Sequence, residues 1–290
     1  DYNCLVFVLE NIFGFNQFNS GQLPIITNAL RCFDTLGLLP TGSGKSLCYQ
    51  LVALLQPCIS FVVDPIKSLM YDQKDNLDKR YITHTNFISS DQSPNEKSII
   101  QKEFAEGKYL FIWISPERFQ TQTFRDYLTY LNQHLHIGMA VIDEVHCVSE
   151  WGHDFRTSYL NLSKTIRAYC PGATVLGLTA TASVNVLKDI LIEFNISNDN
   201  VKTLPSFTRP ELKFIVIKDN GEKKEKTNNI EELIKKLDRQ RNVLSVSGDS
   251  TMSGLIFTTA VNGDYGCYVL SNYLTDRLNT KVNWYSGTIP

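Results

Sequence analysis

The sequence lacks the features that would assign it to a membrane-spanning, secreted or strongly basic class of protein. No run approaches the roughly 18 to 20 apolar residues that a membrane-spanning helix needs. The first residues carry no basic segment ahead of an apolar stretch, so we expect no secretory signal. Because 28 Lys and Arg nearly balance 30 Asp and Glu, the net charge of −2 gives no overall attraction to nucleic acid. Any such binding must come from local patches.

The seven cysteines form no C-x-x-C pair, so neither a zinc site nor a dithiol redox motif is indicated. They are odd in number and scattered, mostly within apolar runs, where a reduced cysteine behaves as a small buried hydrophobe. This usage is typical of a reducing, intracellular compartment. Hydrophobic residues (43%) and charged residues (20%) occur at the levels of a globular protein, which excludes disordered and collagen-like chains.

Short apolar runs alternate with helical patterns over residues 34–193. Several expected strands, such as 61–63 and 140–142, are continuously apolar, which is typical of parallel strands that helices cover on both faces. The fold class is therefore α/β, a mostly parallel, doubly wound sheet whose ligands bind at the carboxyl ends of the strands. We expect strands at 35–39, 59–64, 84–89, 109–115, 138–143 and 174–179, and helices near 46–55, 66–78, 94–106, 117–132, 157–168 and 183–193.

A length of 290 residues favours about two domains. The charged segment 219–226 is typical of a linker or an exposed insertion, and we expect domains at 1–208 and 209–290. In the second part, Asn229 and Glu232 resemble a reciprocal cap that opens a helix to about Asp238. This part is too short for a complete α/β domain, so we expect a chain that stops within it. Its other expected elements are a strand at 255–258, a helix near 262–278 and a strand at 282–285.

A glycine-rich turn, Thr41-Gly42-Ser43-Gly44-Lys45-Ser46, lies between an expected strand and an expected helix. Its glycines allow successive backbone N–H groups to turn toward a polyanion at the helix N-terminus. Lys45 would reach the β- and γ-phosphates of a nucleotide, and Ser46 would ligate Mg²⁺. The strict phosphate-loop pattern has Gly where Leu39 stands. The alternative is a glycine-rich turn that enters a core helix.

Two adjacent carboxylates, Asp143 and Glu144, follow the apolar strand 138–143. In a protein with a phosphate loop, a strand-end aspartate of this kind holds Mg²⁺, and the next carboxylate can polarise the attacking water. His146 could couple this site to whatever lies beyond it. Without the phosphate loop, such a pair would be an ordinary helix cap with a solvated neighbour.

The segment 147–156 combines aromatic and basic side chains: Trp151, His153, Phe155 and Arg156. Single-stranded nucleic acid needs this mixture, because its bases stack on π-faces while its backbone attracts cations. The alternative is a loop whose aromatic residues pack into the core.

Together these residues resemble the RecQ family of superfamily 2 DNA helicases, with collinear motifs from about Phe13 to Pro290. Residues 141–156 resemble the DEAH box of that family joined to its aromatic-rich loop, with Val145 where Ala is usual. Residues 15–22 resemble the adenine-recognising motif. There Gln22 would read the adenine edge, Phe15 would stack on the base, and Asn19 stands where the family has Arg.

Further motifs extend the resemblance on the DNA side. Residues 62–73 resemble the motif that grips the DNA backbone, with Ser68 matching and Asp64 where the family has Ser. Residues 114–119 resemble the next DNA-side motif of the family. Residues 178–182, which include Thr179 and Thr181, resemble the motif that couples hydrolysis to strand movement. Residues 206–210 resemble the junction between lobes. Residues 254–257 and 284–287 resemble the opening of the second lobe.

The resemblance implies two RecA-like lobes, the second incomplete, with ATP and Mg²⁺ as cofactors and no zinc in this fragment. It implies single-stranded or forked DNA as the partner, with movement in the 3′→5′ direction. It also implies a role in DNA repair and recombination. The implied location is intracellular and cytoplasmic, and in a bacterium the protein would be associated with the nucleoid. The catalytic set would be Lys45, Asp143, Glu144 and His146, with Mg²⁺ on Ser46 and Asp143.

Two alternatives remain open. The sequence contains no Q-x-x-G-R-x-G-R stretch, so the arginine finger of the family is absent from this chain. A nucleotide-gated DNA-binding module with little or no ATPase activity is therefore the second hypothesis. The third is a phosphate-loop protein that handles no nucleic acid, which requires the 147–156 loop to be buried.

Overall fold

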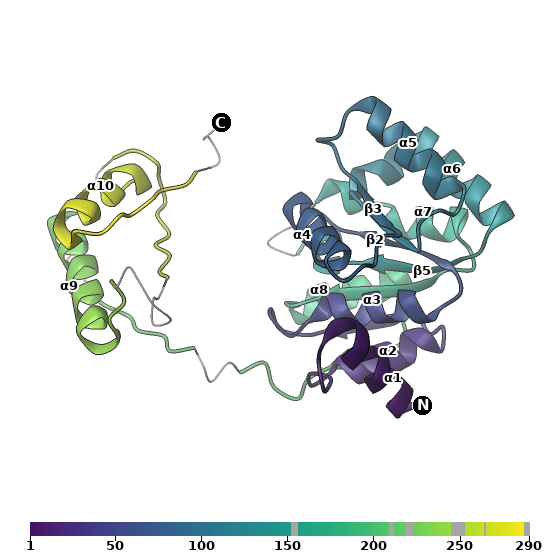
Figure 1. Ribbon diagram of the computed structural model, residues 1–290, viewed down its shortest axis with the longest axis horizontal. Coiled ribbons are helices and arrows are strands. Elements are labelled where there is room, and N and C mark those ends of the chain that lie inside the picture. The colour runs from purple at the N-terminus through teal and green to yellow at the C-terminus, as the bar shows by residue number, and fades with distance from the viewer. Residues whose placement is uncertain (152–155, 209–211, 219–222, 245–252, 264, 287–290) are drawn as a thin grey trace. The chain divides into compact units, whose positions relative to one another are not determined.

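The computed structural model describes residues 1–151, 156–208, 212–218, 223–244, 253–263 and 265–286 (Figure 1). The chain divides into two compact units, Asp1–Thr208 and Arg209–Pro290. Each unit has its own packing, and the predicted phosphate loop and acidic strand end both belong to the first.

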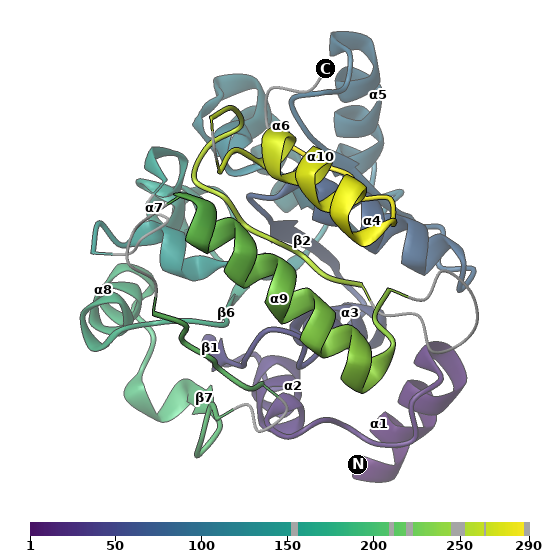
Figure 2. The same cartoon turned by 90° about the vertical axis from the view of Figure 1, so that its left-hand side faces the viewer.

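The first unit is built on a seven-stranded sheet in which every paired neighbour is parallel. The strand order is β3-β4-β2-β5-β6-β1-β7, and β6, β1 and β7 follow one another toward one edge (Figure 2). This confirms the parallel α/β class. The short β7 was not predicted. The strands are β1 (Thr35–Leu38), β2 (Ile59–Val63), β3 (Thr85–Ile88), β4 (Phe111–Ile114), β5 (Ile137–Ile142), β6 (Thr174–Thr179) and β7 (Val201–Thr203).

Helices cover both faces of this sheet. Because side chains alternate along a strand, Phe61 of β2 joins a buried cluster with Leu128, while Val62 joins another with Val52. The first cluster lies under α5 to α8 and the second under α2 to α4. The helices are α1 (Tyr2–Val8), α2 (Gln22–Leu30), α3 (Lys45–Leu55), α4 (Lys67–Asp78), α5 (Pro94–Ala105), α6 (Gln122–His134), α7 (Leu162–Tyr169) and α8 (Val184–Phe194).

Two expected helices are each divided into a short 3-10 turn and an α-helix. The predicted helix 117–132 consists of η2 (Pro116–Gln120) and α6, because Thr121 between them has an extended backbone. The predicted helix 157–168 consists of η4 (Thr157–Tyr159) and α7, with Asn161 in the left-handed region at φ 61°. Asparagine tolerates this conformation, and the chain can therefore change direction there.

The second unit contains two described helices, α9 (Lys223–Arg241) and α10 (Cys267–Leu278). The predicted cap at Asn229 is wrong, because this residue lies inside α9, whose first residues are good helix formers. The predicted strands at 255–258 and 282–285 are wrong as well. Within the described part of this unit no strand forms, since a strand needs a neighbour to accept its backbone hydrogen bonds.

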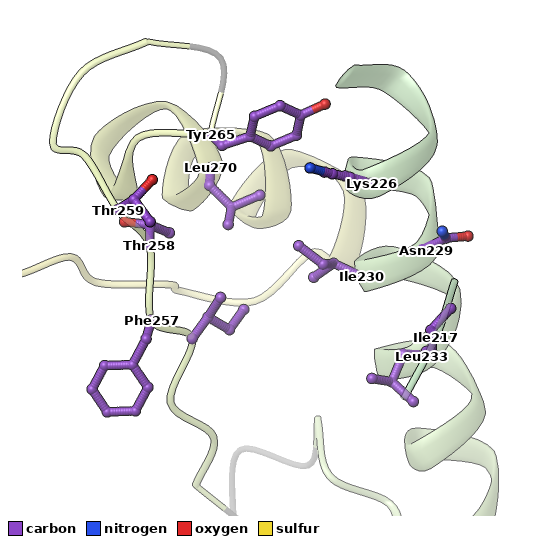
Figure 3. A pocket seen from close by; sticks show the side chains of 11 residues that line it. Ile217, Lys226, Asn229, Ile230, Leu233, Phe257, Thr258, Thr259, Tyr265 and Leu270 are labelled. Carbon is purple, nitrogen blue, oxygen red and sulfur yellow. The ribbon is translucent and has the colours of Figure 1, made fainter. Parts of the chain in front are cut away.

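A cavity of about 420 Å³ lies within the second unit (Figure 3). Its lining includes Ile230 and Leu233 of α9, Leu270 of α10, and Thr258. Tyr273 of α10 donates a hydrogen bond to Glu231 of α9 at 2.7 Å. None of the predicted site residues that the structure describes lines this cavity.

The N-terminus of α5 is closed by a capping box formed by Ser93 and Glu96. Ser93 Oγ accepts a hydrogen bond from the Glu96 backbone N–H at 3.3 Å, and the Glu96 carboxylate accepts one from the Ser93 N–H at 2.8 Å. We expect Ser93→Ala to lower the free energy of unfolding by about 1 kcal/mol in urea titrations. Ser93→Asp, which keeps a capping oxygen, should stay within a few tenths of a kcal/mol of wild type. Equal losses in the two variants would contradict the cap.

Candidate functional site

The predicted phosphate loop occupies the carboxyl end of β1, at the junction with α3. Gly42 and Gly44 have φ angles of 81° and 80°, in the left-handed region that glycine adopts without strain. Gly44 directly precedes the first residue of α3, and Thr41, Gly42 and Gly44 are exposed. The Ser43 N–H donates to the Pro40 carbonyl at 3.1 Å, and the exposed turn lies at the positive end of the helix, where an anion is favoured.

Two amide side chains hold this loop from the preceding segment. The Gln22 Nε2 group donates to the carbonyl oxygens of Ser43 (3.0 Å) and Gly44 (2.9 Å), and its Oε1 accepts from the Asn19 N–H (2.8 Å). The Asn19 Nδ2 group also donates to the Ser43 carbonyl, at 3.2 Å. Gln22 is only 1% exposed, and its amide is engaged with the loop. Phe15, the predicted stacking residue, is 50% exposed.

The loop carries side chains suited to a triphosphate and a metal ion. Ser46 Oγ is partly buried and accepts a hydrogen bond from Gln73 Nε2 at 2.7 Å. Among the described residues, the buried Ser43 Oγ finds no hydrogen-bond partner, although buried hydroxyls normally have one. This orphaned atom and the exposed turn fit a bound phosphate chain.

The acidic strand end lies one strand away from the loop. Strand β6 separates β5 from β1, and parallel pairing brings the carboxyl ends of all three to one edge. Asp143 is 7% exposed; its N–H donates to the Val63 carbonyl (2.9 Å), and the Tyr159 hydroxyl donates to its carbonyl oxygen (3.1 Å). Glu144 has a φ of 48°, and its N–H donates to Asp143 Oδ1 at 3.0 Å.

The charges of these groups act on one another. Burial, followed by the neighbouring Glu144 carboxylate, raises the pKa of Asp143 to about 6, while the Lys45 ammonium acts in the opposite direction. The close contact with His146, assisted by the Lys45 ammonium, lowers the pKa of Glu144. Lys45 of the loop thus lies within electrostatic reach of both carboxylates.

His146 connects the acidic strand end to the end of β6. Its Nδ1 lies 2.8 Å from Thr179 Oγ1 and 3.3 Å from Glu144 Oε2. The Thr179 hydroxyl donates to the Thr181 carbonyl (3.0 Å) and accepts from the Thr181 N–H (3.2 Å). A hydroxyl has a single proton, so the His146 Nδ1–H is the donor in the contact with Thr179. The neighbouring Cys147 sulfur and Glu144 raise the pKa of His146, which favours this protonated form.

The predicted DNA-side residues are exposed where the structure describes them. Trp151 is 74% exposed, which contradicts the alternative that this ring packs into the core. Ser68 is exposed in the first turn of α4, and exposed Arg156 donates through Nη1 to the Pro65 carbonyl at 3.0 Å. The predicted residues His153 and Phe155 lie outside the described residues. Arg156 therefore ties the aromatic loop to the segment that precedes α4.

Asp64 is buried beside the acidic strand end rather than exposed at the start of α4. It is 2% exposed, and its Oδ1 accepts a hydrogen bond from the Ile66 N–H at 2.8 Å. Burial, followed by the Asp143 carboxylate, raises the pKa of Asp64 to about 7.

Sequence patterns did not identify two further residues of this site. Tyr159 holds the Asp143 carbonyl, and Gln73 contacts Ser46, but no motif position marked either for that role. The only available signal was that Gln73 ends the segment 62–73, which resembles a DNA-side motif.

The parallel sheet, with a glycine turn between β1 and α3, has the fold of a RecA-like phosphate-loop domain. The family model described as "DEAD/DEAH box helicase" matches residues 19–190, and the chain belongs to this family. It is similar to the ATP-dependent DNA helicase RecQ of Haemophilus influenzae, at 37% identity over 207 residues, which cover 71% of this chain and 32% of the relative. It is similar to RecQ of Bacillus subtilis at 36% identity, covering 76% of this chain and 36% of the relative. The resemblance to RecQ helicases is thus confirmed.

The chain spans about a third of the length of these bacterial relatives. Among solved structures, it resembles the Mycobacterium smegmatis helicase Lhr bound to ssDNA and AMP-PNP, with a TM-score of 0.60 and 16% identity over 96% of this chain and 37% of that chain. It also resembles a hypothetical ATP-dependent RNA helicase from Sulfolobus tokodaii, with a TM-score of 0.53 and 18% identity over 70% of this chain and 57% of that one. At these identities the likeness shows the fold. None of the described helices is long and apolar enough to cross a membrane.

The buried Asp64 carboxylate predicts a pH-dependent stability. Its folded-state pKa of about 7 exceeds the ordinary value of 3.8, so between these pH values the folded chain holds a proton that the unfolded chain has lost. This group therefore stabilises the fold as pH falls from about 7 toward 4, and its buried charge destabilises the fold above pH 7. Asp64→Asn keeps the acceptor for Ile66, and we expect it to raise the free energy of unfolding by about 2–4 kcal/mol at pH 8.

Urea unfolding at pH 5 and pH 8 measures this effect. The gain from Asp64→Asn should be much smaller at pH 5 than at pH 8. Asp75→Asn, which changes an exposed carboxylate that pairs with Lys79, is the control and should show little change at either pH. An equal gain for Asp64→Asn at both pH values would refute the raised pKa.

Proposed function

We propose that this chain is the motor core of an ATP-dependent DNA helicase, in which ATP hydrolysis drives translocation on single-stranded DNA and unwinding of duplex DNA. The observation that carries the proposal is the convergence of the phosphate loop and the acidic strand end on either side of β6, with Lys45 acting on both carboxylates. The relatives named ATP-dependent DNA helicase RecQ support it.

In this proposal different residues of the nucleotide site bind the phosphates, hold the metal ion and orient the water. The backbone N–H groups of Gly42, Gly44 and Lys45 and the Ser43 hydroxyl would bind the phosphates, and Lys45 would neutralise the charge of the terminal one. Ser46 and Asp143 would hold Mg²⁺, which would supply positive charge to the phosphates. Glu144 orients the attacking water, because His146 keeps its carboxylate ionised.

The DNA side connects to this site through His146. Its contact with Thr179 joins the acidic strand end to the segment of Thr181, which follows β6. Trp151 would stack on bases, Arg156 and Ser68 would contact the DNA backbone, and the predicted residues His153 and Phe155 belong to the same loop. DNA binding could thus change the position of Glu144 through its contact with His146.

The proposal extends to organisation and setting. Residues 1–208 would form the first RecA-like lobe, and 209–290 a linker with part of the second lobe. Closure of two such lobes around ATP and reopening after hydrolysis would ratchet the protein along one strand, with 3′→5′ polarity. The partner would be single-stranded or forked DNA. The protein would be located in the cytoplasm, where DNA is accessible to it. In a bacterium it would be associated with the nucleoid.

A second candidate function is a nucleotide-gated DNA-binding module with little or no ATPase activity. This fragment contains no Q-x-x-G-R-x-G-R stretch, and an arginine finger accelerates phosphoryl transfer by about 10³ to 10⁵, so this candidate concerns the fragment alone. DNA-stimulated phosphate release separates the two functions. Nucleotide-dependent DNA binding without stimulated release would favour the module.

The loop lysine provides the direct test of the nucleotide site. We expect Lys45→Ala to reduce ATP turnover at least about 100-fold, because it removes the positive charge nearest the terminal phosphate. Binding of a single-stranded oligonucleotide without nucleotide should largely survive. Lys102→Ala changes an exposed lysine of α5 and should behave as wild type in phosphate release and in binding of a fluorescent ATP analogue. Retained turnover in Lys45→Ala would remove the phosphate-loop assignment.

The His146–Thr179 contact predicts a coupling defect. Thr179→Val keeps the branched shape in the buried strand but removes the hydroxyl that His146 contacts. We expect the ratio of DNA-stimulated to basal phosphate release to fall about tenfold, the factor that corresponds to a hydrogen bond of a charged group. Thr174→Val, at the opposite end of the same strand, should leave the ratio unchanged. An unaltered ratio in Thr179→Val would exclude this coupling route.

A further inference from the structure

A row of polar side chains connects the phosphate loop to α4. Gln50 Nε2 donates to Gln73 Oε1 at 2.6 Å, and Gln73 Nε2 donates to Ser46 Oγ at 2.7 Å. Ser46 and Gln50 lie four residues apart on α3 and therefore on one face of that helix. The Gln73 amide reaches across from α4 and bridges them.

This row fixes the orientation of the Gln73 amide and of the Ser46 hydroxyl. Because the oxygen end of the amide faces Gln50, its nitrogen end faces Ser46 and occupies one lone pair of Oγ. Ser46 Oγ keeps its second lone pair for another ligand.

The same helix carries the predicted DNA contact. Ser68 lies in the first turn of α4, five residues before Gln73, which is about 7.5 Å along the helix axis. The segment just before α4 is held by the bond from Arg156 to the Pro65 carbonyl. A force applied at the exposed end of α4 would therefore be carried to Gln73 by a rigid element.

We propose that Gln73 is a positioning residue that aims the Ser46 hydroxyl at Mg²⁺ and links the DNA-facing end of α4 to the metal. The inference rests on the proposed function. Mg²⁺ requires near-octahedral ligands at about 2.0–2.1 Å, so an unaimed hydroxyl is a poorer ligand. By linkage, DNA that tightens Mg²⁺ binding through α4 must itself bind more tightly when Mg²⁺ and nucleotide are present.

The test measures binding rather than turnover. A fluorescent, non-hydrolysable ATP analogue is titrated with Mg²⁺, with and without a single-stranded oligonucleotide, on the full chain. We expect Gln73→Ala to raise the Mg²⁺ concentration of half-saturation about fivefold, the factor that corresponds to one hydrogen bond, and to abolish its dependence on DNA. Gln50→Leu leaves Gln73 in place without its orienting partner and should give a smaller shift in the same direction. Asn76→Ala, which changes an exposed amide of α4, should match wild type.

A double-mutant cycle with Ser46→Ala separates aiming from general destabilisation. Once the hydroxyl is gone, Gln73→Ala should add no further shift in the Mg²⁺ midpoint, whereas a merely structural role would add one. An unshifted midpoint in Gln73→Ala, with tight binding by wild type, would overturn the inference and leave the proposed function standing. A wild-type chain that binds no nucleotide at any Mg²⁺ concentration would overturn both.

Discussion

The parallel register of β5, β6 and β1 is the constraint on which the rest of this molecule depends. Leu38 of β1 pairs with Thr179, and Ile142 of β5 pairs with Gly177 on the other side of β6. The residues that follow the two outer strands, the glycine turn and the carboxylates at 143–144, therefore emerge at the same edge, with Thr179 between them. An antiparallel or shifted β6 would separate phosphate-binding and metal-binding groups without changing any of them.

Two carboxylates are buried at the edge of the sheet where the proposed nucleotide site lies. Asp64 and Asp143 are nearly inaccessible to solvent, and the Asp143 carboxylate adds to the burial that raises the pKa of Asp64, while Lys45 and His146 provide positive charge near Asp143. Desolvated carboxylates destabilise the fold unless a cation is close. A divalent ion with a triphosphate would therefore meet preorganised partners that have already lost most of their solvent, which strengthens each electrostatic interaction at the site.

Local patterns predicted what depends on neighbours in the sequence. The continuously apolar strands, the glycine turn and the carboxylates after 138–143 were identified because burial, backbone conformation and strand ends leave local signatures. The contacts of Gln22 and Gln73 were missed, because their partners lie 21 and 27 residues away in sequence. The predictions of strands in the second unit were wrong for the same reason. An apolar run in the sequence indicates a strand, but a strand forms only when a neighbouring strand pairs with it, and the local sequence does not show that neighbour.

Two routes lead from the exposed side of the first unit to two residues of the proposed nucleotide site. One runs from the segment after β6 through Thr179 and His146 to Glu144, and the other runs along α4 through Gln73 to Ser46. Both consist of short, partly buried hydrogen bonds, in which losing one partner costs more than the bond itself is worth. A site built this way would respond to small displacements at its edges, because Ser46 and Glu144 are each contacted by a residue of a different element. In the proposed function, coupling between the DNA side and the nucleotide site would follow from these contacts.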